Sequence, residues 1–320
     1  MADAYRITGF PRLHLGLIDL SEATRRAYGG AGMAVDGLPT VLTVRDAAGT
    51  EIGSPGLSSS ARTAIEKALD AAGRAGWDVR CRIDVHEAPP DHVGLGSTTT
   101  AVLCALRGLA AIRGYAPRDA ELQRLSGRGR TSGAGVNTFF SGGLGVDVGQ
   151  PREPGRHAYL PSSANPRPAP SRKLLALPLP DDWRVSLLLH DGAPTVHGAR
   201  EVAFFRRNTP VSPDDTLAMI AELYHGLLPA VLETDLPLFS AALREFQGRG
   251  FKRAEIAGQP APVRDLLAEL RRDPGIACGL SSMGPMLFAI HEKGAFEPAE
   301  GVRVFGPFPF RNEGHECVPL

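Results

Sequence analysis

Residues 89–100 read PPDHVGLGSTTT, and this stretch decides the fold because a strand-like segment leads into it and an apolar helix leads out of it. Gly94 and Gly96 let the backbone approach a ligand closely, since neither carries a Cβ atom. Ser97 is placed to cap the helix, with three threonines in the first turn. The first-turn N–H groups lack intrahelical acceptors and lie at the positive end of the helix dipole. The spacing predicts either a phosphate or pyrophosphate site at this helix start or an ordinary glycine turn with a serine cap.

The chain before and after this loop alternates strand-like and helix-like segments. Residues 57–75 place alanine, leucine and isoleucine on a helical period, and residues 79–85 alternate apolar and polar side chains as a half-buried strand does. A long apolar helix is expected over about residues 97–112. Further segments are expected as strands at residues 6–20, 39–44 and 144–148 and as a glycine-rich stretch at 127–145.

A proline-rich segment separates the two halves of the chain. Residues 149–173 are poor in apolar side chains, which predicts a surface excursion or linker. We therefore expect an N-terminal domain at residues 1–160, with the phosphate-binding loop, and a C-terminal domain at residues 174–320. The second half is expected to form an apolar strand at 185–189, helices at 213–228, 236–247 and 261–271, and then a glycine-serine loop and strands. Mixed sheet and helices in two layers indicate the α+β class.

The composition is that of a globular protein. The chain has 320 residues, of which 43% are hydrophobic and 22% charged, and this is enough for one large domain or two fused ones. The formal net charge of zero argues against a broad nucleic-acid or membrane surface, and it leaves room for a local anion pocket. Neither a bilayer-spanning apolar run nor a secretion signal is seen, so no membrane partner is expected.

Cysteine and lysine are both sparse. The four cysteines form no C-x-x-C pair, which argues against a zinc site or disulfide framework and fits a cytoplasmic protein. Basic charge comes almost entirely from arginine, a bias typical of a GC-rich genome. Anions are therefore expected to be held mostly by guanidinium groups and backbone N–H groups.

Three segments together resemble the GHMP kinase superfamily. The loop at 89–100 is similar to the phosphate-binding pattern P-x-x-x-G-L-G-S-S. FPRLHLGLIDL at residues 10–20 looks like the first motif of the superfamily, and GLSSMGPMLFAI at residues 279–290 lies where the third belongs. The resemblance spans nearly the whole chain, and it implies a GHMP-kinase-like two-layer α+β fold.

Two departures separate this chain from the kinases. Many GHMP kinases carry S-G-x-D before a glycine pair, whereas residues 132–135 here read SGAG, so that Gly135 stands in the place of the aspartate. The third motif has SSMGP at residues 281–285 in place of a glycine run. Both departures resemble the beta-ribofuranosylaminobenzene 5'-phosphate synthase family. RLHLGLIDL at 12–20, Arg26 followed by a glycine pair, and GRGRTSGAG at 127–135 also match that family.

The resemblance implies a reaction of 5-phosphoribosyl-1-pyrophosphate (PRPP). Its C1 is joined to a carbon of a hydroxy- or aminobenzoate, with loss of CO2 and pyrophosphate. A related branch makes C-nucleoside antibiotics of the formycin and pyrazofurin types from a carboxylated pyrazole, and the arginine, alanine and proline bias favours that branch. The expected partners are small-molecule substrates without nucleic acid, the expected cofactor is Mg²⁺, and the family suggests a homodimer.

The expected site residues fall into three groups. Donors aimed at the departing pyrophosphate stabilise the transition state, each by up to ~3 kcal/mol. The residues expected to bind phosphate or PRPP are Gly94, Leu95, Gly96, Ser97, Thr98, Thr99, Arg12, Arg128, Arg130 and Ser132. The residues expected in catalysis are Asp19, Arg26 and His14. The residues expected to bind the acceptor or close the site are His190, Asp191, Glu201, Ser281, Ser282 and Gly284, with His197 and Arg206 nearby.

Several of these residues have a second, structural interpretation. Asp19 is either a metal ligand or stabiliser of positive charge at C1, or a strand-end carboxylate. His14 is either a donor to substrate or a packed strand histidine. Glu201 is a second candidate metal ligand, although a helix surface explains it equally well. No strong base is needed at the acceptor carbon, because CO2 leaves in place of a proton, and this accounts for the lost kinase aspartate.

Two other functions remain open from the sequence. An ATP-dependent GHMP small-molecule kinase shares the phosphate loop and differs at Gly135 and the third motif. A catalytically silent ligand-binding homologue would keep PRPP binding without turnover. Consumption of ATP, or tight PRPP binding without reaction, would distinguish these alternatives.

Overall fold

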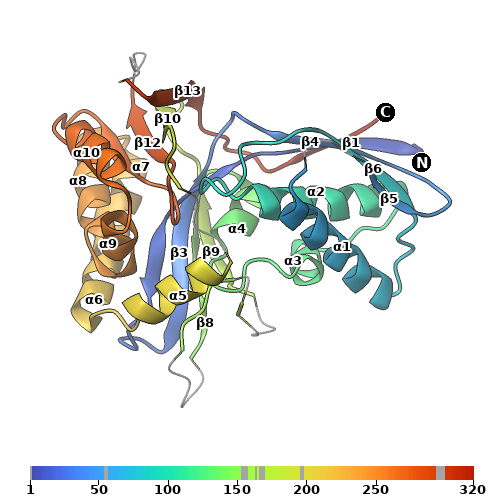
Figure 1. The fold of residues 1–320 in the computed structure, drawn as a ribbon, viewed down its shortest axis with the longest axis horizontal. Helices are drawn as coiled ribbons and strands as arrows, with labels where there is room; N and C mark the ends of the chain where they lie inside the picture. The colour runs from blue at the N-terminus through green and yellow to red at the C-terminus, as the bar shows by residue number, and fades with distance from the viewer. Residues whose placement is uncertain are drawn as a thin grey trace.

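The computed structural model describes residues 2–53, 57–152, 158–162, 164–165, 170–194, 198–292 and 300–320. The first of its sheets has the strand order β14-β1-β4-β6-β5. Its strands are β1 (Ala4–Gly9), β4 (Thr40–Arg45), β5 (Thr50–Gly53), β6 (Cys81–Glu87) and β14 (Glu316–Pro319). The helix α2 (Ser97–Ile112) packs on β1 and β4, and α1 (Ser59–Arg74) and α3 (Asp119–Ser126) pack on α2. Figure 1 shows these elements together, with both chain ends close to β1.

The second sheet places the first motif in the middle of the molecule. Its strands are β2 (Arg12–Asp19), β3 (Arg26–Ala34), β7 (Leu144–Asp147) and β9 (Lys173–Leu177), and the short β8 (Gln150–Pro151) also pairs with β3. The helix α4 (Ala134–Ser141) packs closely on β3 and β7. Gly32 permits this approach, because a Cβ atom there would lie only 2.9 Å from the Cβ of Ala134.

The third sheet and most of the later helices form the other side of the molecule (Figure 1). The sheet order is β11 (Ala277–Leu280), β12 (Leu287–His291), β10 (Arg184–His190) and β13 (Val302–Pro309). The helical elements are α5 (Ala199–Asn208), α6 (Pro213–Glu222), the π-helical turn η1 (Leu223–Leu227), α7 (Leu228–Glu233), α8 (Leu236–Gln247), α9 (Gly250–Ala257) and α10 (Ala261–Leu270). One apolar core joins the second and third sheets to α6, α7 and α8 through residues such as Leu13, Trp183 and Phe239.

The predicted α+β class is confirmed, and most predicted elements are present. The helices expected at 97–112 and 236–247 coincide with α2 and α8. The helix expected at 213–228 is interrupted by η1 and continues in α7, and the segment 6–20 divides into β1 and β2. No described helix is both long and apolar enough to cross a membrane.

Strand pairing connects the two halves of the chain across the expected linker. Immediately after it, β9 pairs with β7, and near the end of the chain β14 pairs with β1. Part of the linker lies outside the described residues, and β8 forms within the described part. The domain boundary at 160–174 stays a prediction, and strands from both sides of it share sheets.

Candidate active site

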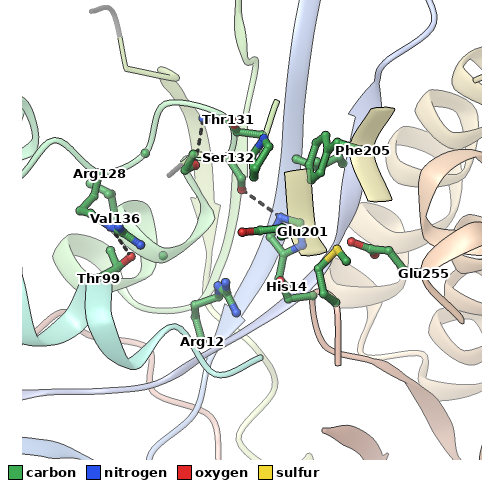
Figure 2. A pocket seen from close by; sticks show the side chains of 17 residues that line it. Arg12, His14, Thr99, Arg128, Thr131, Ser132, Val136, Glu201, Phe205 and Glu255 are labelled. Atoms are coloured by element: carbon green, nitrogen blue, oxygen red, sulfur yellow. Dashed lines mark hydrogen bonds between the residues drawn. The ribbon is translucent and has the colours of Figure 1, made fainter. Parts of the chain in front are cut away.

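A pocket lies where the three sequence motifs meet (Figure 2). Three side chains of β2 line the pocket, namely Arg12, His14 and Leu17. A bulge in the strand pairing between His14 and Gly16 places these odd- and even-numbered positions on the same side of the strand. Thr99 of α2 lines it as well. Further lining residues come from the segment 128–136, from α5 and α9, and from the loop after β11. They include Arg128, Ser132, Gly135, Glu201, Phe205, Glu255, Ser282 and Met283.

Two arginines give one side of the pocket its positive charge. Figure 2 shows the guanidinium groups of Arg12 and Arg128 directed at the same central space. Burial, together with the charge of Arg128, lowers the pKa of Arg12 to about 10, so Arg12 remains protonated at neutral pH. Arg128 Nε donates to Thr99 Oγ1 at 2.9 Å, which ties it to the first turn of α2. Two adjacent cations make this side of the pocket suited to an anion.

The start of α2 differs in one respect from the expectation. The N-cap is Gly96, with a φ of 78°, so the prediction that Ser97 caps the helix is wrong. The Ser97 hydroxyl donates to Asp91 Oδ1 at 2.6 Å. The Thr99 N–H donates to the Gly96 carbonyl, whereas the N–H groups of Ser97 and Thr98 have no acceptor among the described residues. The two open N–H groups retain the anion-binding capacity of a helix start.

One carbonyl group joins the three motifs. The Gly94 carbonyl oxygen accepts from Arg12 Nη1 at 2.5 Å and from Ser281 Oγ at 2.7 Å. Ser281 Oγ in turn accepts from the His14 N–H at 3.0 Å. Gly94 has a φ of 97°, and a Cβ atom there would lie 2.3 Å from the Ser281 carbonyl oxygen. Only glycine fits this close contact.

His14 is a neutral, buried member of the pocket. Burial, with the nearby charges of Arg12 and Lys252, lowers its pKa well below the ordinary value. Its Nε2 and Ser132 Oγ form a hydrogen bond at 3.0 Å. Its Nδ1 is buried without a hydrogen-bond partner among the described residues. His14 therefore carries no charge near neutral pH and retains one ring nitrogen for a ligand or water.

Two residues expected in catalysis do not line the pocket. The Asp19 carboxylate is buried in the turn after β2, where it accepts from the N–H and hydroxyl groups of Ser21 and Thr24 at 2.6–3.1 Å. Arg26 donates through Nε to the Val148 carbonyl and through Nη2 to the Gly149 carbonyl at 2.9 Å. Both side chains hold turns at the far end of the second sheet, which favours the structural interpretation of each.

Other expected residues are spread through the molecule. Arg130 donates to the Asn165 carbonyl at 3.1 Å, and Asp191 pairs with Arg303 at 3.0 Å. His190 Nδ1 bonds the Asp191 carbonyl at the exposed end of β10, and Arg206 is exposed on α5. Leu95 is buried in the loop before α2, Gly284 has a φ of 75° in the loop after β11, and His197 lies outside the described residues. The structure brings Arg12, His14, Thr99, Arg128, Ser132, Glu201 and Ser282 to one pocket, and their roles there stay predictions.

Two residues of α9 beside the pocket have no distinctive sequence pattern. Lys252 is fully buried, and its Nζ lies 2.5 Å from Glu255 Oε2. The same Nζ donates to the Ser282 carbonyl at 2.7 Å, which connects α9 to the third motif. The available signal was a lysine three residues before a glutamate, in a chain with few lysines. That pattern is common on helix surfaces, so it did not single out these residues.

An apolar wall lies on the Glu255 side of the pocket. Leu17, Phe205 and Met283 are buried, belong to one apolar cluster and line the pocket. Figure 2 shows Phe205 and Glu255 on the side away from Arg128. The pocket therefore has a cationic side suited to phosphates and an apolar side suited to a flat hydrophobic group.

The carboxylates suit a magnesium ion held mainly by a substrate. Within the described residues, no three His, Cys, Asp or Glu side chains form a group that could hold a metal. The oxygens of Asp19 are engaged in its turn, so Asp19 does not fit a metal. Glu201 lies in the pocket near Arg128 and fits as a single protein ligand, because Mg²⁺ commonly takes one or two carboxylates together with substrate phosphates.

Solved structures with the same fold define the class of this protein. Homoserine kinase from Cytophaga hutchinsonii superposes with a TM-score of 0.69, at 15% identity over 99% of this chain and 98% of that one. Mevalonate diphosphate decarboxylase from Staphylococcus aureus gives a TM-score of 0.66, at 14% identity over 99% and 98%. The predicted GHMP-kinase-like fold is thereby confirmed, and identities this low carry the fold alone.

Curated relatives show the family. A beta-ribofuranosylphenol 5'-phosphate synthase from Archaeoglobus fulgidus is 32% identical over 308 residues, which are 96% of this chain and 92% of the relative. One of the same name from Methanothermobacter thermautotrophicus is 30% identical, over 92% of each chain. No family model matches the chain. The chain belongs to the beta-ribofuranosylphenol 5'-phosphate synthase family, a family of ribosyl-transferring enzymes.

Proposed function

We propose that this protein transfers the 5-phosphoribosyl group of PRPP to a ring carbon of a carboxylated aromatic acceptor, with release of CO2 and pyrophosphate. The observation that carries the proposal is the two-sided pocket, in which Arg12 and Arg128 face an apolar wall that contains Phe205. A densely anionic donor and a flat acceptor match these two sides. The names of the relatives, which describe a ribosylated phenol 5'-phosphate, support the same chemistry.

The cationic side acts on the leaving group. As the bond between C1 and pyrophosphate breaks, negative charge develops on pyrophosphate and positive charge develops on the ribose. Arg12 and Arg128, which line the pocket, stabilise the departing anion. We assign a supporting role to the N–H groups of Ser97 and Thr98 in the same helix turn as the lining residue Thr99. A preorganised donor of this kind contributes about 3 kcal/mol to the lowering of the barrier. Magnesium at Glu201 would supply additional positive charge at the phosphate oxygens when bound.

The apolar side holds the acceptor with its carboxylate-bearing carbon toward C1. Attack by that carbon gives a ring with one tetrahedral carbon, and loss of CO2 then restores aromaticity. The ring carbon has no proton to lose, so this pocket requires no carboxylate where the kinases have one. Gly135 is consistent with this, since it leaves space beside Arg12 and Thr99.

The names of the relatives and the two-sided pocket together support a class of acceptor. A 4-hydroxybenzoate combines a flat ring, a carboxylate and an electron-donating hydroxyl group, and the name ribofuranosylphenol describes its product. An aminobenzoate or the carboxylated pyrazole of C-nucleoside antibiotic synthesis presents the same carboxylate and a similar ring. The high arginine content is the observation that favours the antibiotic branch as a second candidate.

The test is an assay of purified protein with PRPP and each of the three acceptor types. We expect equimolar release of CO2 and pyrophosphate with one acceptor and no product with ATP in place of PRPP. The assay is repeated after metal removal and after restoration of Mg²⁺, and we expect activity to depend on the metal. Phosphorylation of any acceptor by ATP, with PRPP ignored, would replace this proposal by the kinase alternative.

A further inference from the structure

The buried ion pair of Lys252 and Glu255 has no role in the proposed ribosyl transfer as it stands. Both residues are almost completely buried on α9, with Nζ and Oε2 2.5 Å apart. Burial of two charges has a large desolvation penalty, and apolar residues of similar size often stabilise a protein at least as well. The pair is therefore poorly explained by stability alone. Glu255 also lines the pocket, where Figure 2 shows its carboxylate directed at the interior.

The surroundings of Glu255 suit a proton acceptor. Burial raises the pKa of Glu255, while the charges of Lys252 on its own helix and Arg12 on β2 act to lower it. Arg128 and Glu201 also line this pocket, whereas His14 is neutral near pH 7. A carboxylate with a raised pKa is a stronger base than an exposed one, and the apolar wall beside it keeps water away.

The position of Glu255 matches one end of a para-substituted ring. The hydroxyl of a 4-hydroxybenzoate lies on the ring carbon opposite the one that attacks C1. Figure 2 shows Arg128 and Glu255 on opposite sides of the pocket, with Arg12 between them in this view. An acceptor ring against Phe205, with its attacking carbon toward the cationic side, directs its hydroxyl to Glu255.

We propose that Glu255 takes the proton of the acceptor's ring hydroxyl while the carbon–carbon bond forms, and so selects a phenolic acceptor. This inference rests on the proposed ribosyl transfer. The carboxylate-bearing carbon bonds to C1, and the electron pair of the broken C1–O bond leaves with pyrophosphate. The hydroxyl proton moves to Glu255, which leaves a dienone whose ring oxygen is uncharged and whose carboxylate is still in place. The C–CO2 bond then breaks, its electron pair restores the aromatic ring, and the ring oxygen regains the proton from Glu255.

The test compares Glu255→Gln with the wild type on two acceptors. With 4-hydroxybenzoate, we expect kcat to fall on the order of 100-fold, the usual contribution of a general base. With 3,5-difluoro-4-hydroxybenzoate, whose hydroxyl is already ionised at the assay pH, we expect most of that loss to disappear. Glu269→Gln, at an exposed position of α10, is the matched control and should leave both rates unchanged.

A double variant distinguishes the loss of the proton acceptor from misfolding. Glu255→Gln leaves Lys252 buried without its partner, so Glu255→Gln with Lys252→Met removes both charges and should show the same acceptor-dependent loss. PRPP affinity, measured by calorimetry, should stay near wild type in both variants. Equal losses with the two acceptors, or a normal kcat with 4-hydroxybenzoate, would overturn the role of Glu255. A wild-type protein that releases no CO2 or pyrophosphate would instead refute the ribosyl transfer itself.

Discussion

At the scale of single residues, the pocket separates side chains that face a ligand from those that hold a turn. Arg12 and Asp19 belong to one short motif, yet Arg12 faces the pocket and Asp19 bonds its own turn. Arg26 and Arg128 differ in the same way, because Arg26 is bonded to backbone carbonyls and Arg128 lines the pocket. The direction of a side chain, more than its motif, therefore decides its role.

Arg128→Gln should weaken PRPP binding with little effect on folding. Loss of a charged hydrogen-bond donor corresponds to about 1.5–3 kcal/mol, so the KM for PRPP should rise about 10- to 100-fold. Arg124→Gln, on the exposed side of α3, is the control and should behave as wild type. Steady-state kinetics with varied PRPP gives the measurement, and an unchanged KM would show that PRPP does not bind at Arg128.

Asp19→Asn should reduce stability more than turnover. The carboxylate accepts from two N–H and two hydroxyl groups, and an amide offers only one oxygen to them. Burial of unsatisfied donors costs about 1–3 kcal/mol, so the unfolding temperature should fall by several degrees. The kcat per folded molecule should stay near wild type. A large loss of kcat without a loss of stability would return Asp19 to catalysis.

At the scale of elements, the pocket is built where α2, α4 and α9 approach β2. The start of α4 carries the glycine that replaces the kinase aspartate, and a Cβ atom at Gly135 would lie 3.5 Å from Thr99 Cγ2 and 3.6 Å from Arg12 Cγ. These are ordinary contacts, so a larger residue can be accommodated. Packing therefore does not require glycine at this position. An aspartate here would repel an anionic ligand, and this explains the glycine better.

Gly135→Asp should inhibit the enzyme without producing a kinase. The new carboxylate would lie beside Arg12 and compete with the pyrophosphate for its charge. We expect PRPP affinity to fall at least about tenfold, as for the loss of one charged interaction. Gly135→Asn adds similar bulk without charge and should recover most of the affinity. Calorimetric titration with PRPP distinguishes them, and equal losses would indicate steric exclusion.

At the scale of the whole molecule, one buried carboxylate of the second sheet connects two segments that are distant along the chain. Asp147 at the end of β7 accepts from the Gly133 N–H at 2.9 Å and the Gly149 N–H at 3.0 Å. It thereby connects the loop before α4 to the turn that also receives Arg26. The structure contains one chain, so the expected homodimer stays a prediction that sedimentation equilibrium would check.

The pH dependence of the free energy of unfolding should reveal the titration of the buried Asp147 carboxyl group. Burial raises its pKa to about 7 in the folded protein, against hydrogen bonds from Gly149 and Gly133 that lower it. An acid with a raised folded pKa stabilises the fold below its unfolded pKa, and this contribution is lost as the pH rises to the folded value. Between about pH 5 and pH 7, the free energy of unfolding should lose about 1.4 kcal/mol per pH unit from this group.

Asp147→Asn provides the comparison. The amide cannot ionise, so the difference between wild type and variant should change with pH in that window, while the contributions of His14 and Glu255 cancel. The measurement is the unfolding free energy of both proteins across the range. Parallel curves would show that Asp147 is ionised in the folded state throughout.

The sequence by itself determined the fold family and the local elements that carry the motifs. The glycine loop, the apolar helix at 97–112 and the lost aspartate at Gly135 are local patterns, because backbone conformation and periodicity depend on near neighbours. These patterns also led to the prediction that Arg12 and Arg128 bind a phosphoribosyl donor, and the structure places both arginines in one pocket. They could not predict that Ser97 bonds Asp91 in place of capping the helix.

Which side chains meet depends on how distant parts of the chain pack together. Glu255 is 243 residues from Arg12 along the chain, yet the two side chains interact across one pocket. No local sequence pattern in α9 predicts that they lie close together. Asp19 and Arg26 lie within family-like segments, but Asp19 bonds N–H and hydroxyl groups of its own turn and Arg26 bonds the carbonyls of Val148 and Gly149. Contacts between distant segments depend on how the sheets and helices pack, and a side chain's direction follows from that packing.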